Sequence, residues 1–119
     1  MDRMIYPMKL RAPLKDYLWG GTRLKTEYAK ETALAKVAES WELACHGEDQ
    51  GVIVNGEDAG MTLEAYIGRE GAHVALGSHG SRHPYFPLLI KLIDAHDDLS
   101  VQVHPDDSYA FAHEGEYGK

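Results

Sequence analysis

The sequence of 119 residues has only one cysteine, Cys45, so no disulfide can form within the chain. It has no apolar run of membrane-spanning length, and its first ten residues, MDRMIYPMKL, lack the apolar stretch of a secretory signal. Positive charge is scarce, since 19 acidic residues outnumber 12 lysines and arginines and give a net charge of −7. Without a basic excess to displace counterions, nucleic acid is an improbable partner. These absences predict a cytoplasmic protein that binds neither membranes nor nucleic acid.

Short apolar stretches, separated by glycine, proline and polar turns, predict a mainly β architecture, either a sandwich or a barrel. The length allows one domain with a modest core. Strands are expected at 4–10, 39–46, 87–94 and 99–104, with a further short strand after Gly51. Short helices are expected at 21–30, from Thr62 onward and after Pro105, and residues 77–84 are expected to form a polar loop. Thr22 and Thr62 are the expected N-caps, and the last helix is expected to open at Asp106 and Asp107, whose charges suit a helix N-terminus.

The stretch LSVQVHPDD, residues 99–107, carries the most informative pattern. On an extended strand one face would be apolar (Leu99, Val101 and Val103), and the other would present hydrogen-bonding groups (Ser100, Gln102 and His104). Gln102 and His104 would lie roughly 7 Å apart on one face, close enough to bind one metal ion. A solvent-facing strand end explains the same pattern, and on spacing alone it is the commoner explanation. The polar face therefore contacts either water or a site.

Other candidate site residues also allow two interpretations. Lys91 interrupts the apolar run LLIKLID, so it lies at a sheet edge, extends its ammonium to solvent, or binds an anion. Glu39, near Trp41, is a tuned acid or base, or an ordinary paired strand residue. Trp19, before a Gly-Gly pair, could stack on a sugar or fill the core. Ser100 could bind a phosphate or hydroxyl group, or be a surface serine.

Three blocks of the sequence resemble type I phosphomannose isomerases, also called mannose-6-phosphate isomerases. FPLLIKLIDAHDDLSVQVHPDD, residues 86–107, is similar to the long signature of that family. PLKDYLWGG, residues 13–21, and VAESWELACH, residues 37–46, match its N-terminal blocks in the same order. The resemblance extends over roughly residues 5–119, and the central motif is too long to be a chance match.

The resemblance implies a cupin (jelly-roll) fold, here an N-terminal partial cupin with short helices in its connections. It implies one zinc ion and the interconversion of mannose 6-phosphate and fructose 6-phosphate through a cis-enediol. Gln102 and His104 match the first two zinc ligands of the family. Ser100 and Lys91 match positions near the sugar phosphate, and Trp19 and Glu39 fall in blocks near the pocket, so Lys91, Ser100 and Glu39 are the expected catalytic residues.

The resemblance also implies that residues 1–119 are an N-terminal portion that ends before the third zinc ligand. The family has a glutamate in a segment whose lysine matches Lys119, and a histidine ligand and further basic residues lie downstream. We therefore expect the chain alone to be inactive. Two alternatives stay open: a non-catalytic truncated cupin that binds metal or sugar phosphate, or a homo-oligomer formed through open sheet edges.

Overall fold

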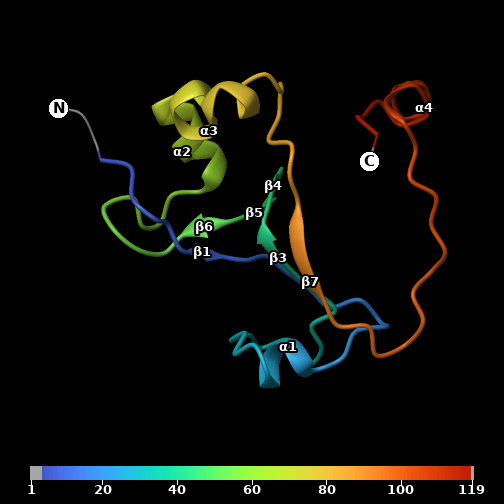
Figure 1. Cartoon of the computed structure of the whole chain (residues 1–119). Coiled ribbons are helices and arrows are strands. Elements are labelled where there is room, and N and C mark those ends of the chain that lie inside the picture. The colour runs from blue at the N-terminus through green and yellow to red at the C-terminus, as the bar shows by residue number, and fades with distance from the viewer. Residues whose placement is uncertain (1–3, 119) are drawn as a thin grey trace.

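The computed structural model describes residues 4–118, so Lys119, matched above to the family's lysine, lies outside the described residues. Its strands pair antiparallel throughout, in one three-stranded sheet and two two-stranded sheets. The strands are β1 (Leu10–Arg11), β2 (Leu14–Lys15), β3 (Glu39–Leu43), β4 (Cys45–His46), β5 (Asp49–Gln50), β6 (Val52–Ile53) and β7 (Ile90–Ile93). The helices, α1 (Arg23–Thr26), α2 (Leu63–Glu70), α3 (Ala72–Gly80) and α4 (Asp107–His113), lie in the connections (Figure 1). The predicted all-β class with short connecting helices is confirmed.

The three-stranded sheet has the order β2-β3-β7. It joins the three sequence blocks described above, because β2 lies in residues 13–21, β3 in 37–46 and β7 in 86–107. Lys15 of β2 pairs with Glu39 of β3, and Trp41 of β3 pairs with Lys91 of β7. The register shifts between Trp41 and Leu43, so β3 is irregular there. Cross-strand partners project to the same face of a sheet, and this register therefore gathers Lys15, Glu39, Trp41 and Lys91 on one face.

Helix starts follow local side-chain chemistry in two of the three expected cases. The Thr62 hydroxyl accepts the Ala65 amide at 3.2 Å and caps α2, and the Asp106 carboxylate accepts the Tyr109 amide at 2.9 Å and caps α4. Thr22 precedes α1 as expected but makes no side-chain cap. The expected loop at 77–84 is wrong in its first part, because α3 continues to Gly80 across a kink at Gly77, whose φ is 77°.

The expected strand at 99–104 is absent from the structure. These residues pair with no strand in the described part of the chain, and the side chains that should form its apolar face are exposed, with Val101 at 99% and Val103 at 91%. A strand requires a neighbour that satisfies its backbone N–H and C=O groups. The alternating pattern fixes which side chains share a face, but it does not supply that neighbour. In Figure 1 the segment curves away from β7 and ends at α4.

The core is small and includes residues of the three-stranded sheet, of β6 and of the helices. Val37, Ala38 and Ser40 are fully buried, and Ile53 is 1% exposed. Gly20 packs directly on this core, since a Cβ there would lie 2.5 Å from the Ala38 Cβ. The WGG sequence is therefore explained locally by a close approach of two backbone segments, which only glycine permits. Within residues 4–118 no helix is both long and apolar enough to cross a bilayer.

Candidate active site

A buried carboxylate lies at the centre of the candidate site. Glu39 is 5% exposed, and its Oε1 accepts a hydrogen bond from Trp41 Nε1 at 3.0 Å. Lys91 Nζ donates to Glu39 Oε1 at 3.1 Å and to Oε2 at 3.2 Å. The three side chains meet because Glu39 and Trp41 are two residues apart on β3 and Lys91 is the cross-strand partner of Trp41. The unusual lysine in LLIKLID is thus explained, since its ammonium binds a buried carboxylate.

The Lys91 ammonium is paired but still accessible. Its side chain is 34% exposed, whereas that of Glu39 is 6% exposed. An ammonium has three donors, and two contacts to one carboxylate leave at least one N–H for another partner. The arrangement therefore joins a carboxylate shielded from water, that of Glu39, to a cation that solvent or a ligand can reach.

Sequence reasoning missed two members of this sheet face. Trp41 was considered only as a neighbour of Glu39, yet its indole is the second hydrogen-bond donor to that carboxylate. Lys15 Nζ lies 4.7 Å from the centre of the Trp41 ring and forms an ion pair with Asp49 Oδ1 at 2.7 Å. Alternation along β3 could have placed Glu39 with Trp41, but the pairing of β2 with β3 that brings in Lys15 has no signal in the sequence.

The other face of β3 carries a second polar group. Glu42 Oε1 accepts a hydrogen bond from the Ser40 hydroxyl at 2.7 Å and binds Lys30 Nζ at 2.6 Å. Burial raises the pKa of the Glu42 carboxyl, but the hydrogen bonds from Lys30 and Ser40 outweigh burial and lower it. Ser40 is fully buried, so this group fixes the strand and is separate from the Glu39 side.

The backbone of Trp19 is hydrogen-bonded to the turn at the end of the same sheet. Its carbonyl accepts the amides of His96 at 2.9 Å and Asp97 at 3.0 Å, and the next residue, Gly20, bridges to Ala95. The half-buried indole contacts the Tyr17 ring at a centroid distance of 5.7 Å. The turn after β7 is thus fixed to the WGG block, so the three blocks singled out in the sequence converge in space.

Ser100, Gln102 and His104 lie apart from this cluster, on the unpaired segment after β7. Gln102 Nε2 donates to the Ser100 hydroxyl at 3.2 Å, so the two side chains share a face as alternation predicts. Gln102 and His104 also line a hollow of about 310 Å³ together with Glu114, Glu116 and Tyr117. All three candidate side chains are exposed, and none has a hydrogen bond or ion pair to Glu39 or Lys91 in the described part of the chain.

The donor atoms of Gln102 and His104 fit two positions of a zinc site. The Gln102 amide nitrogen is occupied by Ser100, which leaves its carbonyl oxygen for a cation, and imidazole nitrogen is a common zinc ligand. Among residues 4–118, no group of three or more His, Cys, Asp and Glu side chains is arranged to hold a metal ion. The described residues therefore provide part of a ligand set.

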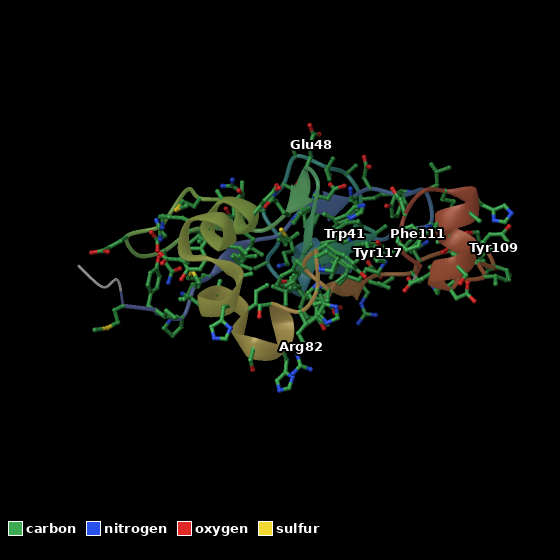
Figure 2. All side chains as sticks on the ribbon, turned by 90° about the horizontal axis from the view of Figure 1, so that it is seen from above. Trp41, Glu48, Arg82, Tyr109, Phe111 and Tyr117 are labelled. Atoms are coloured by element: carbon green, nitrogen blue, oxygen red, sulfur yellow. The ribbon has the colours of Figure 1, made fainter. Side chains whose placement is uncertain are left out.

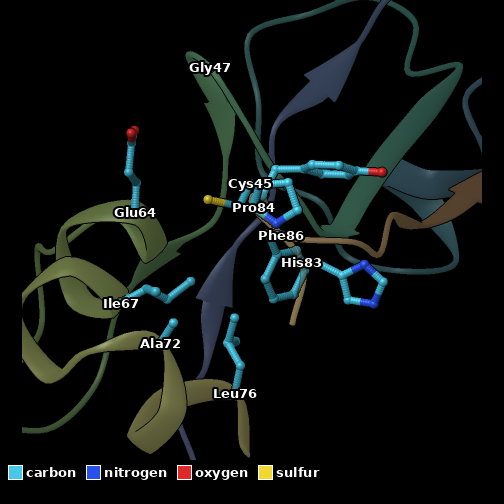
Figure 3. Close-up of a pocket in the computed structure, with 10 residues that line it drawn as sticks. Cys45, Gly47, Glu64, Ile67, Ala72, Leu76, His83, Pro84 and Phe86 are labelled. Atoms are coloured by element: carbon cyan, nitrogen blue, oxygen red, sulfur yellow. The ribbon is translucent and has the colours of Figure 1, made fainter. Parts of the chain in front are cut away.

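Cys45 lines a separate and mainly apolar hollow of about 270 Å³ between β4 and the helices α2 and α3. Figure 3 shows Ile67 and Leu76 projecting from the helices, while the Glu64 carboxylate points away from both. Burial, and to a smaller extent the Glu64 charge, raise the pKa of the Cys45 thiol. A protonated thiol is a poor nucleophile, so Cys45 is a weak candidate for covalent catalysis.

The comparisons with known proteins agree with these blocks. The model of the phosphomannose isomerase type I catalytic domain matches residues 8–117. The mannose-6-phosphate isomerase of Streptococcus mutans is 38% identical over 116 residues, covering 98% of this chain and 35% of the relative. Mannose-6-phosphate isomerase ManA of Bacillus subtilis is 40% identical over 114 residues, covering 95% of this chain and 35% of that protein.

A solved mannose 6-phosphate isomerase from Bacillus subtilis has the same fold. It aligns with 94% of this chain and 35% of its own length, at 35% identity and a TM-score of 0.79. The cupin class expected from the sequence is confirmed by this neighbour. The chain spans about 35% of the length of the curated relatives it matches and corresponds to their N-terminal part. With a match over residues 8–117, the chain belongs to the phosphomannose isomerase type I family and carries part of its catalytic domain.

Proposed function

We propose that this chain forms the N-terminal part of a zinc-dependent isomerase that interconverts mannose 6-phosphate and fructose 6-phosphate. The observation that carries the proposal is the ion pair between the buried Glu39 carboxylate and the accessible Lys91 ammonium, which are 52 positions apart in the sequence. The relatives from Streptococcus mutans and Bacillus subtilis are mannose-6-phosphate isomerases, and we take the substrate from them.

An aldose–ketose isomerisation moves a proton between C1 and C2 of the open-chain sugar, through a cis-enediol. The step requires a group that accepts and returns a proton and a cation that holds the phosphate or a developing oxyanion. Glu39 supplies a carboxylate shielded from water, and Lys91 supplies an ammonium with a free donor. We assign the proton-transfer role to Glu39 and the anion-binding role to Lys91.

Trp19 and Ser100 complete the substrate contacts in this proposal. A half-buried indole beside the turn after β7 offers an apolar surface for one face of a sugar. The Ser100 hydroxyl accepts from Gln102 and can still donate to a phosphate or sugar oxygen.

Gln102 and His104 would hold the zinc ion, through an amide oxygen and an imidazole nitrogen. When bound, zinc supplies Lewis-acid polarisation of the sugar carbonyl. Zinc sites in proteins use three or four protein ligands, so two residues give weak binding until further ligands are added. We therefore propose that this chain alone binds zinc weakly and has no isomerase activity of its own.

A chimaera tests the function directly. This chain replaces the matching third of the Bacillus subtilis enzyme, and isomerisation of mannose 6-phosphate is measured in the zinc-loaded protein. We expect activity, with a loss on Lys91→Met or His104→Ala and little change on His113→Ala, which alters another exposed histidine. A folded, zinc-loaded chimaera that isomerises no sugar phosphate would refute the proposal.

A second function, self-association, is favoured by the exposed apolar side chains near β7. Leu88 is 56% exposed, Ile90 53% and Ile93 50%, and in the described chain β7 pairs only on its β3 side. An open and apolar sheet edge invites pairing with a second copy. Sedimentation should then show a dimer that Ile90→Lys converts to monomer, while a concentration-independent monomer would exclude it.

Location follows from the proposed substrate. Sugar phosphates carry charge that prevents passive passage through a bilayer. An enzyme acting on them works where sugars are phosphorylated, and we therefore place the protein in the cytoplasm.

A further inference from the structure

We propose that Tyr85 and Tyr117 form an aromatic clamp that positions the segment bearing Gln102 and His104. Tyr117 is a positioning residue in this proposal, because its packing fixes the position of the segment that carries the candidate ligands. The metal-binding role of those ligands rests on the proposed function, whereas the clamp rests on contacts between rings within this chain.

The segment that carries the candidate ligands has few ties to the rest of the fold. The hydrogen bonds that involve a side chain in residues 99–118 of the described chain join two members of that same segment: Gln102 to Ser100, Tyr109 to Asp106, His113 to Tyr109 and Gly118 to Asp107. The backbone bonds of Ala110 and Glu114 also stay within it. The segment pairs with none of the described strands. Its position relative to the sheet must therefore depend on side-chain packing.

The ring of Tyr117 provides that packing. Its centroid lies 4.4 Å from that of Tyr85, at an interplanar angle of 38°, and 4.6 Å from that of Phe111 in an edge-on contact. Tyr117 also lines the hollow shared by Gln102 and His104. The same ring thus contacts α4, borders the candidate ligands and packs on Tyr85.

Tyr85 connects this packing to the sheet. It lies five residues before Ile90, the first residue of β7, and it also lines the Cys45 hollow beside α2 and α3. Its contact with Tyr117 therefore closes a loop that begins at β7, passes through Ser100, Gln102 and His104, and returns through α4. Fixing both ends of a loop restricts the positions available to the residues within it.

The chain offers a matched control in Tyr109. Figure 2 shows Phe111 and Tyr117 on the side of α4 toward the sheet, with Tyr109 on the other side. Tyr109 is 54% exposed and stacks on His113 of its own helix at 4.0 Å. Tyr109 lies on α4 and Tyr117 lies after that helix, so removing the Tyr109 ring deletes the same atoms from the same segment but leaves the clamp intact.

The test measures the placement of α4 directly. With Cys45→Ala as background, spin labels are attached at Glu48→Cys and Ser108→Cys, two exposed positions on opposite sides of the clamp. The distribution of distances between the labels is measured by pulsed electron spin resonance. We expect a narrow distribution in the parent, in Tyr117→Phe and in Tyr109→Ala, and a broad one in Tyr117→Ala and Tyr85→Ala.

Two further measurements separate positioning from general folding and from metal binding. Amide exchange of β3 and β7 should stay unchanged in Tyr117→Ala. Zinc affinity, measured by competition with a chelator, should fall roughly 2- to 10-fold in Tyr117→Ala and not in Tyr117→Phe, as expected for the loss of one aromatic pair.

The clamp is refuted if Tyr117→Ala and Tyr85→Ala give the same distance distribution as Tyr109→Ala. It is also refuted if these variants expose β3 to exchange, because the rings would then support the whole fold. Should the labels respond as expected while no variant binds zinc, the clamp stands and the proposed metal role fails.

Discussion

Replacing Lys91 by methionine tests whether the Glu39–Lys91 pair is the buried, coupled group that the site requires. The change removes two contacts, of 3.1 and 3.2 Å, and leaves a carboxylate with a 6% exposed side chain whose remaining hydrogen-bond partner among residues 4–118 is Trp41. Removing one partner of a fully buried pair costs about 3–5 kcal/mol, and a hydrogen bond to a charged group contributes about 1.5–3 kcal/mol. The Lys91 side chain is 34% exposed, so water screens part of the pair and we expect the lower range, about 2 kcal/mol.

Urea unfolding followed by tryptophan fluorescence is the assay, since the Trp41 indole is itself bonded to Glu39. A loss of about 2 kcal/mol lowers the urea midpoint by roughly 1–2 M for a chain of this size. The double variant with Glu39→Gln should recover part of that loss, because no unpaired charge is left buried, and this gives a coupling energy of about 1–2 kcal/mol.

Lys15, on the same sheet face, and Asp49, on β5, provide the control pair. Their side chains are 21% and 41% exposed, so a cycle of Lys15→Met and Asp49→Asn should give a coupling below about 1 kcal/mol. Equal couplings for the two pairs would refute the claim that Glu39 and Lys91 form a distinct, protected group. A midpoint unchanged by Lys91→Met would refute it as well.

Three further predictions follow from local chemistry. Thr62→Ala should lower the free energy of unfolding, measured in urea, by about 1 kcal/mol. Thr22→Ala removes no side-chain cap and should have almost no effect, so equal losses would contradict the capping assignment. The hydrogen bonds that outweigh burial lower the folded-state pKa of Glu42 below its ordinary 4.5, so its contribution to stability is present above pH 4.5 and lost as pH falls through the folded pKa. The stability difference between the parent and Glu42→Gln should therefore shrink on acidification below pH 4.5, and a difference that grows would oppose this sign. Burial, and to a smaller extent the Glu64 charge, raise the pKa of the Cys45 thiol. Alkylation of Cys45 by iodoacetamide at about pH 8 should therefore be slower than that of an unfolded cysteine peptide, and it should be faster in Glu64→Gln than in the parent. An unchanged rate in Glu64→Gln would exclude the Glu64 effect.

Features set by neighbours in the sequence were predictable. The caps at Thr62 and Asp106 each depend on an acceptor three residues before the amide that it binds. The Thr62 cap formed as expected, and Asp106 precedes the helix that was expected to open there. The apolar runs of β3 and β7 were also placed within a few residues of their observed bounds. In each case the interactions that favour the element lie inside the segment itself.

Features set by distant partners were not predictable. Thr22 makes no side-chain cap, and the amide of Arg23 at the start of α1 donates instead to the carboxylate of Asp94, 71 positions along the chain from Arg23, at 2.9 Å. The contact of Lys15 with the Trp41 ring depends on the register of β2 against β3, which no local pattern encodes. The resemblance located Glu39 and Lys91 as site residues, but their direct pairing follows only from the cross-strand register.

The segment from Leu99 to His104 combines both kinds of feature. Ser100 and Gln102 share a face and a hydrogen bond because an extended backbone alternates its side chains whether or not a neighbouring strand is present. The strand itself is missing because its hydrogen bonds require a partner. The spacing of the candidate ligands is therefore set by the local backbone, whereas their position relative to Glu39 and Lys91 is set by tertiary contacts. Substitutions in the clamp should accordingly alter zinc affinity without altering the sheet-held ion pair, and substitutions in the ion pair should do the reverse.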